Sequence, residues 1–234
     1  MSQWAPRRFW RDASVSPGSD GFAVLLDGRP LRTPAKAPFL VPSRALAEAV
    51  AEEWRQVGEA VDPRLMPATR LVNVALDRLP AARDAVVAEV AGFGASDLLC
   101  YRAASQPELA LRQEAEWGPW LAWAASLGAP LLVAEGLMPV DQPPASLRAL
   151  AARVAARDDL ALALLHELVA LSGSLVLGLA VAEGRLGAPE AWRVSRLDED
   201  FQAEEWGRDE EAEAAAEGRR RAFLGAARLL GMLG

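Results

Sequence analysis

The 234-residue chain has one cysteine, Cys100, and one histidine, His166. One cysteine excludes an intrachain disulfide, and one histidine leaves little for the ligand sets of zinc sites or for Ser-His-Asp chemistry. Cys100 stands between Leu99 and Tyr101, which favours a small buried apolar residue over a nucleophile. His166 has no second ligand four residues away, which favours a core or helix-surface position. The sequence therefore predicts no metal site and no cofactor.

Signatures of nucleotide binding and of carboxylate catalysis are also weak. The glycine pair Gly92 and Gly94 lacks the third glycine and the preceding strand of a dinucleotide-binding fingerprint. Carboxylates at i, i+4 spacing are plentiful, but such pairs are expected by chance in a very acidic segment. We therefore expect a protein that is not an enzyme.

Long apolar runs are missing as well. The longest one, residues 160–182, is interrupted by His166 and Glu167, and its remainder is shorter than the ~20 apolar residues that a bilayer requires. The N-terminus is polar and aromatic, without the apolar region of a secretory signal. The sequence predicts no membrane insertion and a cytoplasmic location.

Negative charge is concentrated in one segment. The formal net charge is -7, yet residues 198–217 hold ten carboxylates and one arginine, Arg208, so the rest of the chain is slightly positive. Such a block repels nucleic acid, although short basic stretches stand at residues 7–11 and 219–221. We expect no nucleic-acid partner, and a solvated, self-paired helix surface is favoured over a docking patch.

The N-terminal residues predict strands. Apolar residues fill positions 22–26, the pair Asp27 and Gly28 suits a two-residue hairpin turn, and positions 38–41 form another extended piece. Ser43 then stands where it can cap a helix. The expected fold class is α+β: a small β-rich N-terminal domain over residues 1–42, its boundary as late as about residue 60, followed by a larger, mainly α-helical domain over residues 43–234.

Helical periodicity dominates the rest of the chain. Pro67 and Pro80 mark helix starts, and Gly118 and Pro119 are expected to bend a helix over residues 107–127. Further helices are predicted over residues 143–154, 158–183, 188–206 and 209–233, with a strand at residues 131–133.

The predicted helix over residues 188–206 carries two stripes at 100° per residue. The core-facing stripe consists of Ala191, Val194, Leu197 and Phe201, and the opposite one of Trp192, Ser195, Glu199, Gln202 and Trp206. A solvated helix has little use for two tryptophans on its outer face, so this helix either packs on both sides or presents a recognition surface. Two further alternatives are a general helical adaptor and a carboxylate-based hydrolase that uses the acidic helix 195–206.

Several segments, in this order, carry a resemblance to a known family. They are Arg8-Phe9-Trp10, the hairpin from Gly21 to Pro30 with Thr33-Pro34, Ala51-Glu52-Glu53-Trp54, the segment from Asp97 to Arg102, and Ser195-Arg196-Leu197-Asp198-Glu199 with Gln202 and Trp206-Gly207. Together they resemble the assembly chaperones of the F1 sector of ATP synthase, and among these the chaperone of the α subunit. The resemblance extends from about residue 8 to residue 207.

The resemblance implies a non-catalytic chaperone that binds the free F1 α subunit and shields its β-facing surface until the hexamer forms. It fits a bacterial, cytoplasmic protein, which we expect to be a monomer when free. The match to functional positions of the family is clearest at Glu199 and extends to Gln202, Trp206 and Trp54. We predict client binding by Glu199, Gln202, Trp206 and Trp192 and a structural role for Trp54.

Overall fold

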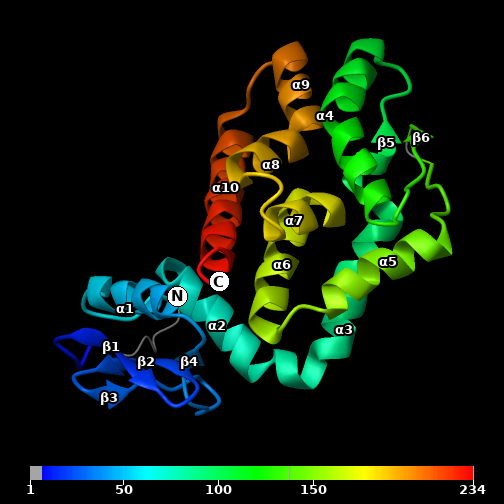
Figure 1. Ribbon diagram of the computed structural model, residues 1–234. Helices are drawn as coiled ribbons and strands as arrows, with labels where there is room; N and C mark the ends of the chain where they lie inside the picture. Colours follow the sequence, from blue (N-terminus) through cyan, green and yellow to red (C-terminus); the bar gives the residue numbers. More distant parts are fainter. Residues whose placement is uncertain (1–6, 137, 234) are drawn as a thin grey trace. The chain divides into compact units, whose positions relative to one another are not determined.

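A computed structural model describes residues 7–136 and 138–233 of the chain (Figure 1). Four short strands come first and α-helices α1 to α10 follow, which confirms the expected α+β class. The chain divides into two compact units. One comprises Met1–Arg83, Asp159–Leu164 and Arg228–Gly234, and the other Asp84–Asp158 and Leu165–Ala227. The predicted domain boundary near residue 42 stays a prediction.

The first unit contains a small antiparallel sheet. Strand β2 (Gly21–Leu26) pairs with β1 (Ala13–Gly18), β3 (Arg29–Pro30) and β4 (Leu40–Val41). The predicted hairpin turn is confirmed, since Asp27 and Gly28 adopt φ angles of 49° and 78° between β2 and β3. Strand β1 was not predicted, because the alternation of Ala13 and Val15 with two serines is short and runs directly into Pro17 and Gly18.

Helix α1 (Arg44–Gln56) packs on β1 and β2. Ser43 caps it as predicted, its hydroxyl accepting a hydrogen bond from the Leu46 amide at 3.1 Å. At the other end the Arg8 guanidinium donates to the carbonyl oxygens of Val57, at 2.6 Å, and Arg55, at 3.2 Å. A cation at the C-terminus of a helix satisfies carbonyl groups that have no partner within the helix.

Helix α2 (Pro67–Asp77) begins at the predicted proline, and a carboxylate of α1 caps it. Glu53 accepts hydrogen bonds from the Ala68 amide at 2.7 Å and from the Thr69 amide and hydroxyl, both at 2.8 Å. Negative charge is favourable at a helix N-terminus, and these hydrogen bonds from Glu53 join α1 to α2.

In the second unit, α4 (Pro107–Ser126) contains Pro119 as predicted and buries Trp117 completely. The predicted strand at residues 131–133 is wrong. The pairing instead joins β5 (Tyr101–Arg102) to β6 (Ala134–Glu135), because the backbone amide and carbonyl of Leu132 are both bound by the Gln142 side chain.

Two of the predicted long helices are each divided in two. Residues 158–183 form α6 (Asp159–Ser172) and α7 (Leu175–Ala182), with Gly173 between them at a φ of 71° that other residues rarely adopt. Residues 188–206 form α8 (Ala188–Ser195) and α9 (Leu197–Trp206), which meet at Arg196.

The remaining helices are α3 (Leu79–Gly92), α5 (Pro144–Ala155) and α10 (Glu210–Leu230). Helix α3 begins one residue before the predicted Pro80. Among residues 7–136 and 138–233, no helix is both long and apolar enough to cross a membrane.

Candidate functional site

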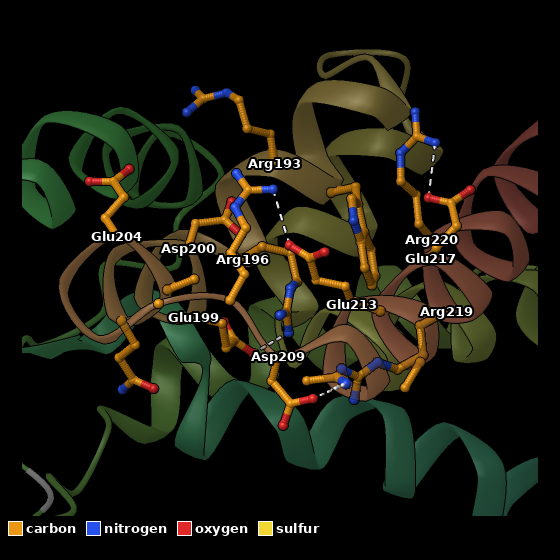
Figure 2. Close-up of a pocket in the computed structure, with 18 of the residues that line it drawn as sticks. Arg193, Arg196, Glu199, Asp200, Glu204, Asp209, Glu213, Glu217, Arg219 and Arg220 are labelled. Carbon is orange, nitrogen blue, oxygen red and sulfur yellow. Dashed lines mark hydrogen bonds and ion pairs between the residues drawn. The ribbon is translucent and has the colours of Figure 1, made fainter.

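Helices α8, α9 and α10 of the second unit line an open cleft of about 890 Å³ (Figure 2). Its lining residues lie between Pro189 and Arg220. The four predicted client-binding residues, Trp192, Glu199, Gln202 and Trp206, all line this cleft, so the structure brings them together at one surface. Trp54 belongs to the other unit.

Three of these four residues are accessible from solvent. Trp206, in the last turn of α9, is 74% exposed and is among the most exposed large apolar residues of the described chain. Gln202, one turn earlier, is exposed, and the Glu199 side chain is 48% exposed. The outer face of α9 therefore offers a carboxylate, an amide and an indole.

The fourth residue, Trp192, is placed differently from the predicted stripe. Only 7% of it is exposed, and its ring packs on Phe223 of α10 at a centroid distance of 5.6 Å. Because α8 ends at Ser195, the 100° periodicity does not continue into α9, and Trp192 lies on the buried side of α8. Ser195, also predicted on the outer stripe, is buried as well, and its hydroxyl donates to the Trp192 carbonyl at 2.8 Å.

The predicted apolar stripe is confirmed as core. Its four residues, Ala191, Val194, Leu197 and Phe201, are all buried. Helix α4 holds this side of α8 and α9 in place. The Trp117 indole donates to the Val194 carbonyl at 2.9 Å, and the buried Gln113 amide donates to the Asp198 carboxylate at 2.7 Å.

A third link from α4 reaches the far end of α9. Arg112 forms an ion pair with Glu204 at 2.6 Å, and its guanidinium lies 5.1 Å from the centre of the Phe201 ring. Helix α9 is thus fixed by α4, and Glu204, which forms part of this link, also lines the cleft.

The cleft has a mixed charge. Its lining arginines are Arg193, Arg196, Arg208, Arg219 and Arg220, and its carboxylates are Glu199, Asp200, Glu204, Asp209, Glu213 and Glu217. Several of them pair across the cleft wall: Arg196 with Glu199, Arg208 with Glu213 at 3.0 Å, and Arg220 with Glu217 at 3.4 Å. Alternating charges around an exposed indole suit a polar protein surface better than a small apolar ligand.

The sequence did not lead us to predict that α10 contributes residues to this cleft. Asp209, Glu213 and Glu217 lie four residues apart just before and within α10, and Figure 2 shows these carboxylates around the same hollow. The i, i+4 spacing that places side chains on one helix face was the available signal. The acidic segment was predicted to be a solvated helix surface in preference to a docking patch.

The other two residues considered in the sequence analysis, Cys100 and His166, lie away from the cleft. Cys100 is buried, and burial, followed by the nearby Asp97 carboxylate, raises the pKa of its thiol to about 12. His166 is paired with Glu89 at 3.3 Å on another helix. In the part of the chain that the structure describes, no group of three His, Cys, Asp or Glu residues could hold a metal ion.

Comparisons with known proteins place the chain in a family. A family model described as ATP12 chaperone protein matches residues 7–125, about half of the chain. The crystal structure of Atp12 from Paracoccus denitrificans is 48% identical with a TM-score of 0.92, and the match covers 97% of this chain and 98% of that one. A substitution mutant of the same protein gives a TM-score of 0.93 at the same identity and coverage.

The crystal structure of the Atu1473 protein from Agrobacterium tumefaciens is 44% identical with a TM-score of 0.91, and the match covers 98% of this chain and 87% of that one. The family model ends before the cleft, whereas these structural matches extend over nearly the whole chain. The chain belongs to the ATP12 chaperone family.

Proposed function

We propose that this protein is an assembly chaperone of the F1 sector of ATP synthase that binds the free α subunit and shields its β-facing surface until the hexamer forms. Membership of the ATP12 chaperone family supports the chaperone activity. The single observation that carries the site is the convergence of Glu199, Gln202 and Trp206 on one open cleft.

The chemistry of the cleft suits a reversible protein contact. An exposed tryptophan provides a large apolar anchor of the kind that dominates binding energy at protein interfaces. The surrounding carboxylates and Gln202 are polar groups that can set the register of a partner and reject surfaces of the wrong charge. An assembly chaperone must release its client, which favours such a mixed, moderate surface over a large dry one.

The helical-adaptor alternative predicts several unrelated partners, whereas the chaperone predicts one dominant client. Mass spectrometry of proteins captured from a bacterial lysate by the tagged chain distinguishes the two. We expect the F1 α subunit to dominate the captured fraction. Capture of many unrelated proteins in similar amounts would favour the adaptor.

The site is tested by charge reversal at Glu199. We expect Glu199→Lys to melt within a few degrees of the native protein, because the Glu199 side chain is half exposed. If the charge becomes buried in the complex, the substitution should weaken α-subunit binding by about 2–5 kcal/mol. The two measurements are thermal unfolding and co-purification of the α subunit with each variant.

Glu205→Lys is the matched control, since Glu205 lies on the same helix and is exposed but does not line the cleft. It makes the same change in net charge, so it should leave co-purification almost unchanged. A folded Glu199→Lys protein that retains the α subunit as well as this control would refute the assignment of Glu199. An unfolded Glu199→Lys protein would assign Glu199 a structural role instead.

A further inference from the structure

Glu199 lies in the first turn of α9, and its carboxylate is held by an ion pair to Arg196, three residues earlier. A half-exposed glutamate has several rotatable bonds, and binding a partner requires one conformation. Ordering such a side chain at an interface opposes binding. A neighbour that already fixes the carboxylate in the free protein reduces the entropy that is lost on binding.

The backbone of Arg196 is held on both sides. Arg196 is the junction residue between α8 and α9, its amide donates to the Arg193 carbonyl at 3.1 Å, and its carbonyl accepts from the Asp200 amide at 2.9 Å. Its side chain is only 17% exposed although it lines the cleft. So little exposed surface leaves Arg196 poorly placed to contact a client directly.

A tilted aromatic pair, Trp192 and Phe223, lies next to the Arg196 guanidinium. The guanidinium carbon lies 6.0 Å from the centre of the Trp192 ring, which in turn packs on the fully buried Phe223. A continuous row of contacts thus runs from the core of α10 through Trp192 and Arg196 to the Glu199 carboxylate.

We propose that Arg196 is a positioning residue for client binding: supported by the Trp192 ring, it holds the Glu199 carboxylate in the orientation that the client meets. This inference rests on the proposed function. It also gives the buried Trp192 a part in the cleft, as the platform for Arg196.

The proposal requires an arginine at position 196. A guanidinium is planar, lies flat on an aromatic ring and presents its N–H groups in a fixed fork, whereas a lysine ammonium is a mobile point charge. Arg196→Lys therefore retains the charge but loses the planar group beside the Trp192 ring and the fixed fork of N–H donors to Glu199. The matched control is Arg153→Lys, because Arg153 is also ion-paired, with Glu183 at 2.9 Å, and does not line the cleft.

The experiment is a double-mutant cycle on α-subunit affinity, with Arg196→Lys, Glu199→Gln and the combined variant, and with thermal unfolding of each. We expect Arg196→Lys to weaken binding roughly three- to tenfold, the scale for ordering one flexible side chain. In the Glu199→Gln background the same change should alter affinity less than about twofold. Arg153→Lys should bind like the native protein.

Other results overturn the proposal. Equal losses from Arg196→Lys in both backgrounds would show that Arg196 contacts the client independently of Glu199, and native affinity of Arg196→Lys would show that it has no role in binding. A large fall in melting temperature with that variant would make Arg196 structural.

A second measurement separates this inference from the proposed function. If the native protein fails to bind the α subunit, the proposed function fails. The crystal structure of Arg196→Lys then decides the positioning role alone. A Glu199 carboxylate that moves while the backbone of α8 and α9 stays in place supports it, and an unmoved carboxylate overturns it.

Discussion

Trp54 illustrates how one side chain packs a helix against the chain segment that precedes β1. It lies in the last turn of α1, and its ring meets the Trp10 ring edge-on at a centroid distance of 5.0 Å. The Trp10 indole donates to the Trp54 carbonyl at 3.1 Å. The Trp54 indole nitrogen is buried without a hydrogen-bond partner among the described residues, so shape and apolar contact dominate its packing.

We predict that Trp54→Arg destabilises the protein by about 2–4 kcal/mol, since a guanidinium would replace the indole against Trp10. Thermal unfolding and limited proteolysis measure the effect. Trp54→Phe is the matched control, because it keeps an aromatic ring and introduces no charge; it loses part of the indole ring and an unpaired N–H group, so it should cost less than about 1.5 kcal/mol. A Trp54→Arg protein that melts like the native one would contradict the structural role.

Asp97 is a completely buried carboxylate that joins two parts of the second unit. It accepts hydrogen bonds from the Ser174 hydroxyl at 2.7 Å and from the Val176 amide at 3.0 Å, so it completes the cap of α7. It also accepts from the Leu99 amide at 3.1 Å. Burial raises the pKa of Asp97 from 3.8 to about 6, although these hydrogen bonds act in the opposite direction.

This shift predicts a pH dependence of stability. Because the folded protein binds the Asp97 proton more tightly than the unfolded chain, its stabilising contribution is complete below pH 3.8 and is lost as the pH rises through about 6. The shift corresponds to about 3 kcal/mol. Urea unfolding from pH 4 to pH 7.5 should show the native protein losing stability relative to Asp97→Asn as the pH rises. Parallel curves for the two proteins would contradict the raised pKa.

Sequence spacing located part of the candidate site residue by residue. Glu199, Gln202 and Trp206 were predicted on one outer face, and the structure places all three in α9 along the cleft. Trp192 was assigned to the same face because the helix was assumed to be continuous. The contact of Trp192 with Phe223 depends on how α10 folds back, which local periodicity does not contain.

At the scale of elements, helix starts were easier to predict than helix breaks. Pro67 begins α2 and Ser43 caps α1, because a proline ring and a serine hydroxyl act within a few residues of the chain. The break at Gly173 depends on Asp97, a residue 77 positions from Ser174, which supplies the cap of α7. Such a break depends on tertiary structure. The apolar periodicity of the sequence continues across it and therefore does not reveal it.

Close packing of α7 on α6 gives a prediction at this scale. A Cβ atom added at Gly178 would lie 2.6 Å from the Val169 Cγ2 atom, and a short branched side chain cannot move far. Gly178→Ala should therefore destabilise the protein by about 1–3 kcal/mol, measured by urea unfolding.

Gly218→Ala is the comparison for that change. Gly218 lies in α10, is exposed, and has no neighbour within 4 Å of an added Cβ atom. Alanine is the better helix former by about 1 kcal/mol, so this variant should be stabilised. Equal effects at both glycines would show that α7 tolerates a wider separation from α6.

For the whole molecule, composition and order of elements predicted the fold class, but pairing between distant segments did not follow from them. Strand β6 pairs with β5 across more than thirty residues, and neither two-residue strand has the length or alternation that marks a strand in sequence. The sequence likewise shows the acidic segment but not its place in the folded protein. The folding of α10 beside α9 is what converts that segment into one wall of a cleft.

If the protein binds a client as proposed, nucleotide hydrolysis is one possible means of release. The sequence lacks a phosphate-binding loop, and Gly92 and Gly94 belong to the end of α3 and the 3₁₀ turn that follows it, with no strand before them. We therefore expect no saturable ATP binding to the chaperone in calorimetry at micromolar concentration. Under the proposed function, release would then depend on competition by the assembling subunits.

Competition of this kind has a kinetic signature. If the β subunit only captures α subunits that have already dissociated, the rate constant of release equals spontaneous dissociation and is independent of β-subunit concentration. Stopped-flow measurement of a fluorescently labelled α subunit, mixed with increasing excess β subunit, tests this. A rate constant that rises with the β-subunit concentration would mean that β displaces the chaperone through a ternary complex.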